Sequence, residues 1–377
     1  MLNRIRIKSY KAFKSETEIE IRPITILIGR NSSGKSSICK LIDALAEAFS
    51  QDIAGFLPIE TERNRLGDTY EDLFYQRISN DLHIGVGFDN GIRIDIAFLM
   101  QGGTFCPRSY SVMKDGVTID RVFNSVKEAA AAGLLGLYWP SVCEEVGVSH
   151  SDVQFSVDYI GPIRSRGQRR LDRAGLRKKT NVGYDGRQVY DMLLQSHLTD
   201  GQLLKNVSDW CEANMDGQRL VLAEQAPGTG IYCLYVERKG VRVNLADVGE
   251  GLAQVLPVIT QSFVRDSDIT IIEQPSLHLN SAAHALVAER IVDSAQQLGK
   301  KYIIETHSDT FLTGIRKMVA SRRIDRQDVV IYFLGNDGSE AILHKIEIDD
   351  NFEYTTWPDG MFEDDYRLQT EISELLG

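Results

Sequence analysis

The sequence of 377 residues lacks the features that mark several large classes of protein. It has no run of 18 apolar residues and no signal-peptide core after Met1, so we expect neither a membrane-spanning helix nor secretion. Its five cysteines are scattered, odd in number and without a C-x-x-C pair, which predicts reduced buried thiols in a cytoplasmic protein. The net charge of −11 argues against a surface that is basic all over, so any nucleic-acid contact must come from a local patch.

Sustained heptads, internal repeats and low-complexity linkers are also missing. A long coiled-coil arm is therefore not expected. With 43% apolar and 25% charged residues, the composition is that of an ordinary soluble globular protein, and the length allows one to three domains.

A phosphate-loop motif, G-x-x-x-x-G-K-[ST], occupies residues 29–37. A β-branched strand, residues 24–28, precedes it, and apolar residues at helical spacing follow from Ile38 to Phe49, which is the order that the motif requires. We expect Lys35 to neutralise the β and γ phosphates of ATP and the Ser36 hydroxyl to ligate Mg²⁺. The alternative is a Gly/Ser-rich turn that binds nothing. The predicted ATP-binding residues are Asn31, Ser32, Ser33, Gly34, Lys35, Ser36 and Ser37.

Periodicity predicts the elements on either side of the motif. Alternating strands are expected at 2–9, 18–21, 83–88, 91–98, 117–122 and 153–160, with hairpin turns at 89–91 and 114–116. Helical spacing is expected at 125–137 and 187–213, and further strands at 219–223, 232–238 and 241–244.

Residues 164–179 carry eight cations and one acid, Asp172, in an otherwise acidic chain. One interpretation is a contact with nucleic-acid phosphates or with a partner's polyphosphate, and the other is a solvated segment paired with carboxylates of the same chain. The predicted contact residues are Arg164, Arg169, Arg170, Arg177 and Lys178.

Polar residues recur where later elements begin or end. Gly249-Glu250-Gly251 precedes a helix, which makes an anion site. The apolar strand 268–273 ends in Glu273, where a Mg²⁺ carboxylate lies beside a phosphate loop in open α/β sheets. After a helix at 281–298, a second such strand ends in Glu305-Thr306-His307, which predicts a parallel sheet with its ligand at the carboxyl ends. The alternative is a capped strand end and an ordinary histidine.

Together these motifs resemble the ABC-type AAA ATPases that include SMC-like repair proteins and the overcoming-lysogenisation-defect family. The resemblance covers nearly the whole chain. Gly161-Pro162-Ile163-Arg164 and the segment 348–362 look like a stand-alone subgroup, and the 70 residues after His307 leave no room for the TOPRIM nuclease module.

The resemblance implies an α/β fold, a two-lobed ATPase head with a mixed, largely parallel core sheet, an antiparallel β subdomain and a helical subdomain. Residues 1–377 would form one discontinuous head. Its parts would be a nucleotide-binding core (1–50 and 245–347), a β-rich insertion (51–160), the basic segment with the helical subdomain (161–244) and a C-terminal tail (348–377).

The resemblance also assigns roles. Glu273 would hold the metal and His307 would sense the γ-phosphate, while Gly249, Glu250 and Gly251 would act in trans in a homodimer that encloses two ATP molecules, and higher oligomers are conceivable. The chain departs from the family at Gln274, where the usual catalytic base is a glutamate; an amide cannot accept the proton but can orient water, so hydrolysis should be slow.

The expected function is that of an ATPase in prokaryotic DNA processing or anti-phage defence, acting with a separate effector protein and no membrane. The alternative is a nucleotide-sensing scaffold with little turnover. A transporter subunit is disfavoured, because the Leu-Ser-Gly-Gly-Gln signature is missing.

Overall fold

The computed structural model describes residues 1–50, 55–78, 81–358 and 361. It divides into two compact units, of which unit 1 comprises Met1–Phe155 and Asp325–Gly377 and unit 2 comprises Ser156–Ile324. Of the expected C-terminal tail, residues 359–360 and 362–377 lie outside the described residues, as do 51–54 and 79–80 of the expected insertion.

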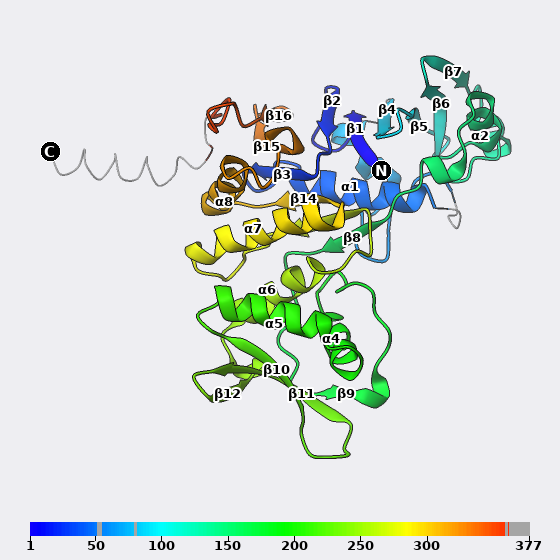
Figure 1. The fold of residues 1–377 in the computed structure, drawn as a ribbon. Helices are drawn as coiled ribbons and strands as arrows, with labels where there is room; N and C mark the ends of the chain where they lie inside the picture. The colour runs from blue at the N-terminus through cyan, green and yellow to red at the C-terminus, as the bar shows by residue number, and fades with distance from the viewer. Residues whose placement is uncertain (51–54, 79–80, 359–360, 362–377) are drawn as a thin grey trace. The chain divides into compact units, whose positions relative to one another are not determined.

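Unit 1 contains a six-stranded antiparallel sheet in the order β2-β1-β4-β5-β6-β7 (Figure 1). Its strands are β1 (Leu2–Lys8), β2 (Thr17–Glu20), β4 (Leu82–Phe88), β5 (Arg93–Gln101), β6 (Thr104–Lys114) and β7 (Val117–Val122). The predicted antiparallel subdomain is confirmed, and so are both hairpins, since β4 pairs with β5 and β6 with β7. Asp115 and Gly116 both have positive φ, 51° and 80°, as a two-residue hairpin turn requires.

The remaining strands of unit 1 pair with one another, and one of them, β3, leads into the phosphate loop. Strand β3 (Ile24–Gly29) is buried and runs parallel to β15 (Val329–Asn336), which pairs antiparallel with β16 (Ala341–Ile346). Helix α1 (Lys35–Ala48) follows the loop and buries its apolar stripe, with the short helices α2 (Val126–Ala131) and α3 (Pro140–Cys143) elsewhere in the unit.

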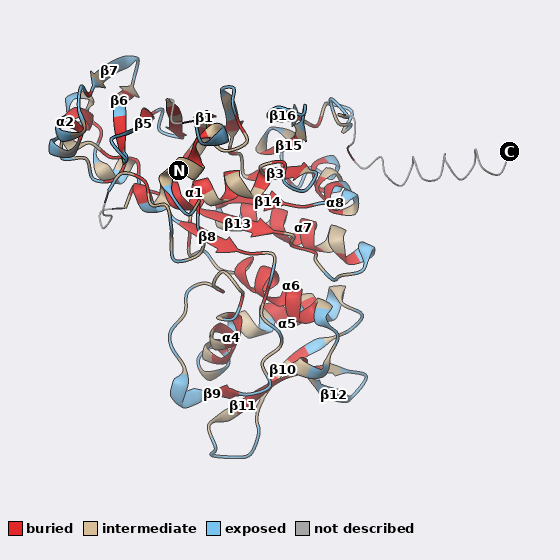
Figure 2. Ribbon diagram, turned by 180° about the vertical axis from the view of Figure 1, so that it is seen from behind, coloured by how far each residue is buried: buried red, intermediate tan, exposed pale blue. Residues whose placement is uncertain are grey.

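Unit 2 contains three parallel strands in the order β14-β13-β8. Strands β8 (Val157–Ile160), β13 (Ile269–Glu273) and β14 (Lys301–Glu305) are buried at every position (Figure 2), as is typical of parallel strands covered on both faces. Helices α6 (Glu250–Gln261), α7 (Ser281–Leu298) and α8 (Asp309–Ala320) accompany them. The predicted parallel arrangement with polar residues at one edge is confirmed.

The rest of unit 2 is a small sheet against two helices (Figure 1). Strands β10 (Arg219–Glu224), β11 (Ile231–Arg238) and β12 (Val241–Asn244) pair in order, and β9 (Leu171–Asp172) also pairs with β11. Helices α4 (Val189–Leu198) and α5 (Gln202–Asn214) are consecutive, and α5 contacts β10. The predicted fold class, an α/β head with mixed sheets and a helical part, is therefore correct.

Three predicted elements differ from those observed. The helix expected at 125–137 ends at Ala131, because Gly133 has φ 73° and Leu137 donates its N–H to the carbonyl of Ala48 at 3.0 Å. The strand expected at 153–160 begins at Val157, where pairing with β13 starts. The helical segment 187–213 is two helices, broken at Gly201 with φ 69°.

Two expectations about the whole chain can be checked on these elements. All five cysteines are free and buried, as predicted. Within the described ranges, no helix combines the length and the apolar character needed to cross a bilayer.

Candidate functional site

The phosphate loop connects β3 to α1 through backbone conformations that favour glycine. Gly29 has φ 144°, and a Cβ there would lie 2.3 Å from the carbonyl oxygen of Leu334. Gly34 has φ 101° and is the N-cap residue of α1, where no side chain caps the first turn. The amide N–H groups at this helix end are therefore not engaged by a capping side chain, which suits an anion.

Lys35 places its charge inside the loop. Its side chain is 3% exposed, and Nζ donates hydrogen bonds to the carbonyl oxygens of Gly29 at 2.9 Å and Arg30 at 2.8 Å. Beside it, Ser33 is buried and its Oγ has no hydrogen-bond partner. A buried hydroxyl without a partner is costly, so a ligand oxygen at this position would fit. The loop residues thus fit a bound polyphosphate.

Strand-end residues gather in unit 2. Glu273, at the end of β13, is 6% exposed, and its Oε1 accepts a hydrogen bond from the hydroxyl of Tyr159 on β8. In register with it on β14 is Glu305, whose carbonyl oxygen accepts the N–H of Gln274 at 2.7 Å. Gln274 has φ 49°, an uncommon value outside glycine. His307 is exposed and lies between β14 and α8. The structure therefore brings the predicted residues Glu273, Gln274 and His307 to one edge of the sheet of unit 2.

The segment Gly249-Glu250-Gly251, called the glycine signature below, forms the start of α6. Gly249 is the N-cap with ordinary φ of −53°, and a Cβ there would meet nothing within 4 Å. A Cβ on Gly251 would lie 2.8 Å from the carbonyl oxygen of His278. Glu250 is exposed and lies 3.8 Å from Arg166. The N-terminal end of α6 has no side-chain cap, so it too can accept an anion.

Arg164 corrects one prediction. It is 4% exposed and donates hydrogen bonds to the carbonyl oxygens of Gln254, Glu273 and Gln274, at 3.1, 2.6 and 3.0 Å. The prediction that Arg164 contacts nucleic acid at the surface is wrong, because its guanidinium is turned into the unit. A signal for this role was present in the sequence: Arg164 follows Gly-Pro-Ile directly after an apolar strand, as Gln274 follows β13.

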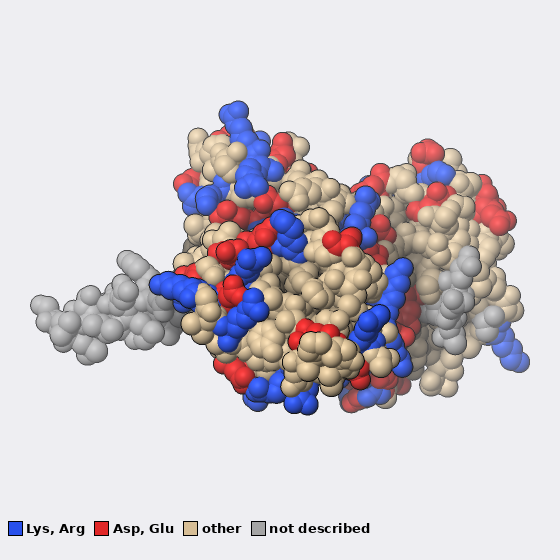
Figure 3. Space-filling view, turned by 60° about the horizontal axis from the view of Figure 1, so that its bottom comes forward, with Lys and Arg blue, Asp and Glu red and all other residues tan. Residues whose placement is uncertain are grey.

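The other cations of the basic stretch lie at the surface, and two of them have acidic partners in the same chain. Arg169 forms an ion pair with Asp247, 2.9 Å between Nη1 and Oδ2, and Arg166 pairs with Glu250. Figure 3 shows Lys and Arg interspersed with Asp and Glu over the face in view. In the described part of the chain, four exposed members of the stretch form no ion pair: Arg170, Arg173, Arg177 and Lys178. Three of these four, Arg170, Arg177 and Lys178, belong to the predicted contact residues, for which the role stays a prediction.

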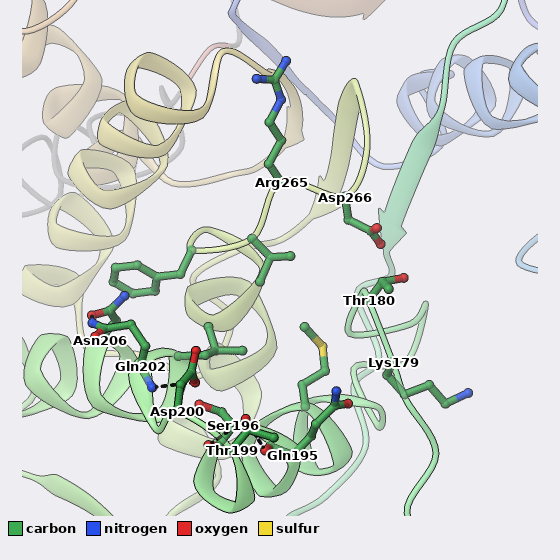
Figure 4. A pocket seen from close by; sticks show the side chains of 14 residues that line it. Lys179, Thr180, Gln195, Ser196, Thr199, Asp200, Gln202, Asn206, Arg265 and Asp266 are labelled. Carbon is green, nitrogen blue, oxygen red and sulfur yellow. Dashed lines mark hydrogen bonds between the residues drawn. The ribbon is translucent and has the colours of Figure 1, made fainter.

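A hollow of about 480 Å³ in unit 2 is lined by one residue of the basic stretch, Lys179. It is lined by parts of α4 and α5 and by residues 263–266. Lys179 and Arg265 extend away from each other in Figure 4, and the acids Asp200 and Asp266 also line the hollow. The mixed charges give it no preference for a phosphate.

A metal site made by protein side chains alone is missing from the described ranges, where no three His, Cys, Asp or Glu residues cluster suitably. Mg²⁺ needs no such cluster, since it is commonly held by one or two protein oxygens and the phosphates of its substrate. Ser36 and Glu273 have the oxygen donors for that role.

Two family models match the chain. One, described as "AAA ATPase domain", matches residues 1–151, and the other, described as "AAA domain, putative AbiEii toxin, Type IV TA system", matches residues 151–313. No protein of curated function matches the sequence.

Solved structures of SMC heads are similar in fold. The "SmcHead bound to the C-winged helix domain of ScpA" is 13% identical with a TM-score of 0.53, covering 92% of this chain and 98% of that one. The "SMC head domain from Thermotoga maritima" is 12% identical with a TM-score of 0.48, covering 92% and 99%. A third, the Pyrococcus furiosus Smc head with an extended coiled coil, bound to the C-terminal domain of ScpA, is 11% identical with a TM-score of 0.48, covering 99% of both chains. The first of these similarities carries the assignment of fold.

Proposed function

We propose that the chain is an SMC-like ABC-type ATPase that binds ATP with Mg²⁺, closes as a homodimer around two nucleotides and hydrolyses them slowly. The observation that carries the proposal is the phosphate loop itself. The buried ammonium of Lys35 lies against two loop carbonyls, the Ser33 hydroxyl has no partner and the first turn of α1 has no side-chain cap.

The proposed roles follow from the donor set. Lys35 neutralises the β and γ phosphates, and the loop from Asn31 to Ser37 surrounds them with N–H groups and hydroxyls. Ser36 and Glu273 hold Mg²⁺, which when bound supplies charge neutralisation at the phosphate oxygens. His307 senses the γ-phosphate.

Slow turnover is proposed because Gln274 occupies the place of the general base. Its amide can hold a water through hydrogen bonds but cannot take the proton from it. The backbone of Gln274 is held at both its N–H and its carbonyl, so the side chain starts from a defined position. A nucleotide-sensing scaffold, which binds and dimerises with almost no turnover, is the second candidate, and the same residue favours it.

The homodimer is proposed from the signature. The N-terminal end of α6 has no side-chain cap, and Gly249 leaves open space in front of it. A γ-phosphate held by the second subunit would complete that helix end. Higher oligomers remain part of the proposal.

The partners are proposed on more general grounds. One matching model is described by a toxin of a toxin–antitoxin system, and one SMC head of similar fold was solved with a domain of ScpA. We propose that the protein acts in the cytoplasm, in an anti-phage defence or DNA-processing system with a separate effector. The proposed nucleic-acid contact consists of the exposed predicted cations without ion pairs, Arg170, Arg177 and Lys178.

The test of nucleotide binding is Lys35→Ala, with Lys40→Ala on the same helix as the matched control. Lys35→Ala should abolish ATP binding and turnover while circular dichroism and the melting temperature show a folded chain, because the main countercharge of the phosphates is gone. Lys40→Ala should bind ATP as the wild type does. Equal ATP affinity in both variants would refute the phosphate-loop assignment.

A further inference from the structure

The guanidinium of Arg164 joins its own loop to two other parts of unit 2, helix α6 and the end of β13. Nη1 donates to the carbonyl oxygen of Gln254, in α6, and Nη2 donates to those of Glu273 and Gln274, at and just beyond the end of β13. The connection with Gln254 is reciprocal, since its Nε2 donates to the carbonyl oxygen of Arg164 at 3.1 Å.

The loop that carries Arg164 is itself held at both ends. Gly161 donates its N–H to Tyr184 and Ser165 donates its N–H to Asp185, each at 2.8 Å. A Cβ on Gly161 would lie 2.5 Å from the ring of Tyr184, so the loop packs closely there. Arg164 is therefore a fixed connector with little freedom to reorient.

Burying this cation is costly, and the contacts offset the cost only in part. Burial lowers the pKa of Arg164 to about 10, with the nearby charge of Glu273 opposing the shift. No carboxylate oxygen hydrogen-bonds the guanidinium in the described structure, and its Nε has no partner. An apolar replacement would in turn leave the carbonyl oxygens of Gln254, Glu273 and Gln274 without this donor, which also costs stability. The location of the contacts, and not their energy, therefore indicates the role of Arg164.

The positions of the two glutamines that Arg164 contacts indicate its role. Gln254 lies about one turn after Glu250, so it moves with the N-terminal end of α6 as a rigid helix. Gln274 is the residue proposed to orient the attacking water, and its backbone is in the sparsely populated left-handed region. A small shift of α6 can therefore displace the backbone of Gln274, because the Arg164 side chain is hydrogen-bonded to both.

We propose that Arg164 is a positioning residue that couples engagement of the α6 N-terminus to the placement of Gln274. When the signature closes on the phosphate of the second subunit, α6 pulls the Gln254 carbonyl, and Arg164 passes the displacement to the Gln274 carbonyl. Hydrolysis is then restricted to the closed dimer. This inference rests on the proposed function, because it needs both trans engagement and turnover.

The experiment compares Arg164→Lys with Arg290→Lys in the full chain. Arg290 is the matched control, since it is also a buried arginine of unit 2 that binds a main-chain carbonyl, that of Ser262 at 2.7 Å, near the other end of α6. Lysine keeps the charge but cannot span three carbonyls. Both variants should lower Tm to a similar extent.

Only Arg164→Lys should lower kcat, by at least about tenfold, since displacement of a reacting group by about 1 Å can cost about 10²-fold. The KM for ATP and the affinity for a fluorescent ATP analogue should stay within about twofold, because the phosphate loop is unchanged. In Arg164→Gly, guanidinium chloride at non-denaturing concentration should restore part of kcat, whereas sodium chloride at equal ionic strength should not.

The outcomes distinguish failure of the coupling role of Arg164 from failure of the ATPase assignment. If the wild type turns over ATP and Arg164→Lys lowers kcat no more than Arg290→Lys does, or guanidinium restores nothing in Arg164→Gly, the coupling role is refuted while the ATPase assignment survives. If the wild type neither binds nor hydrolyses ATP, the proposed function fails and the inference with it.

Discussion

The hydroxyl of Tyr159 on β8 donates a hydrogen bond to Oε1 of Glu273 on the neighbouring strand β13. This contact constrains the orientation of the carboxylate group. Such hydrogen bonds from outside the ligand set typically tune metal affinity.

Tyr159→Phe should raise the Mg²⁺ concentration needed for half-maximal turnover by about tenfold, because the carboxylate loses its orienting partner. The phenylalanine ring retains the packing of Tyr159 against Tyr184, so the fold should persist. Tyr302→Phe, which removes another buried tyrosine hydroxyl in the same sheet, is the control and should leave the Mg²⁺ dependence unchanged. An identical Mg²⁺ titration for wild type and Tyr159→Phe would contradict the assignment of Glu273 to the metal.

Gln274→Glu should increase single-turnover hydrolysis by at least tenfold, at the lower end of the roughly 10²–10⁴-fold range of a general base. Repulsion between the new carboxylate, Glu273 and the γ-phosphate is the reason for choosing the lower end. Gln274→Ala should be slower than wild type, because it cannot orient water. If the glutamate variant is no faster and the alanine variant no slower, another residue activates the water.

Gly249→Asp should weaken the ATP-dependent dimer by at least about tenfold, since like charges placed across an interface cost several kcal/mol. Position 249 suits this test because its φ is ordinary and a Cβ meets nothing within 4 Å, so the monomer tolerates the change. Gly251 does not suit it, since any side chain there meets the His278 carbonyl. Light scattering with ATP measures the dimer, and Gly249→Ala controls for size. A dimer as stable in Gly249→Asp as in wild type would exclude the signature from the interface.

Neutralising Arg170, Arg177 and Lys178 together should weaken DNA or RNA binding. The slope of the logarithm of the binding constant against the logarithm of the salt concentration should become shallower by about 0.9 for each lost phosphate contact. Arg169→Gln is the control, because its guanidinium is already paired with Asp247. ATP binding should be unchanged in both variants. A wild-type protein with no salt-sensitive binding to any nucleic acid tested would end the nucleic-acid proposal.

Because Lys300 is buried, we expect the free energy of unfolding to change at alkaline pH. Its Nζ donates to the carbonyl oxygens of Gln261 at 3.0 Å and Val264 at 2.8 Å, and burial lowers its pKa to about 8, with Asp158 and Asp266 partly opposing. An unfolded lysine has a pKa of about 10.5, so between pH 8 and 10.5 the unfolded state binds more protons than the folded state. Stability should therefore rise with pH in this window.

The full rise attributable to Lys300 would be roughly 3 kcal/mol in the free energy of unfolding. It is obtained from the difference between wild type and Lys300→Met in urea unfolding from pH 7 to 10, which cancels the ionisation of tyrosines and cysteines. A difference that stays constant across this range would show that Lys300 titrates as an ordinary lysine.

The sequence by itself determined the features whose chemistry lies within a few adjacent residues. The phosphate loop, the helix 281–298 and the buried strands that end in Glu273 and Glu305 were all predicted, because strand–loop–helix periodicity and turn chemistry are local. The antiparallel hairpins followed from the same local signals, and the predicted bounds of α7 match those observed.

Only the tertiary structure decided which charges are partnered. In sequence, Arg164 and Arg169 are two cations of one basic stretch, but folding buries the first against carbonyls 90 to 110 residues away and pairs the second with Asp247, 78 residues away. Tyr159 meets Glu273 across 114 residues. Local periodicity says nothing of such pairs, because their energy depends on desolvation and distance in the packed chain, and these are set by which strands and helices pack together.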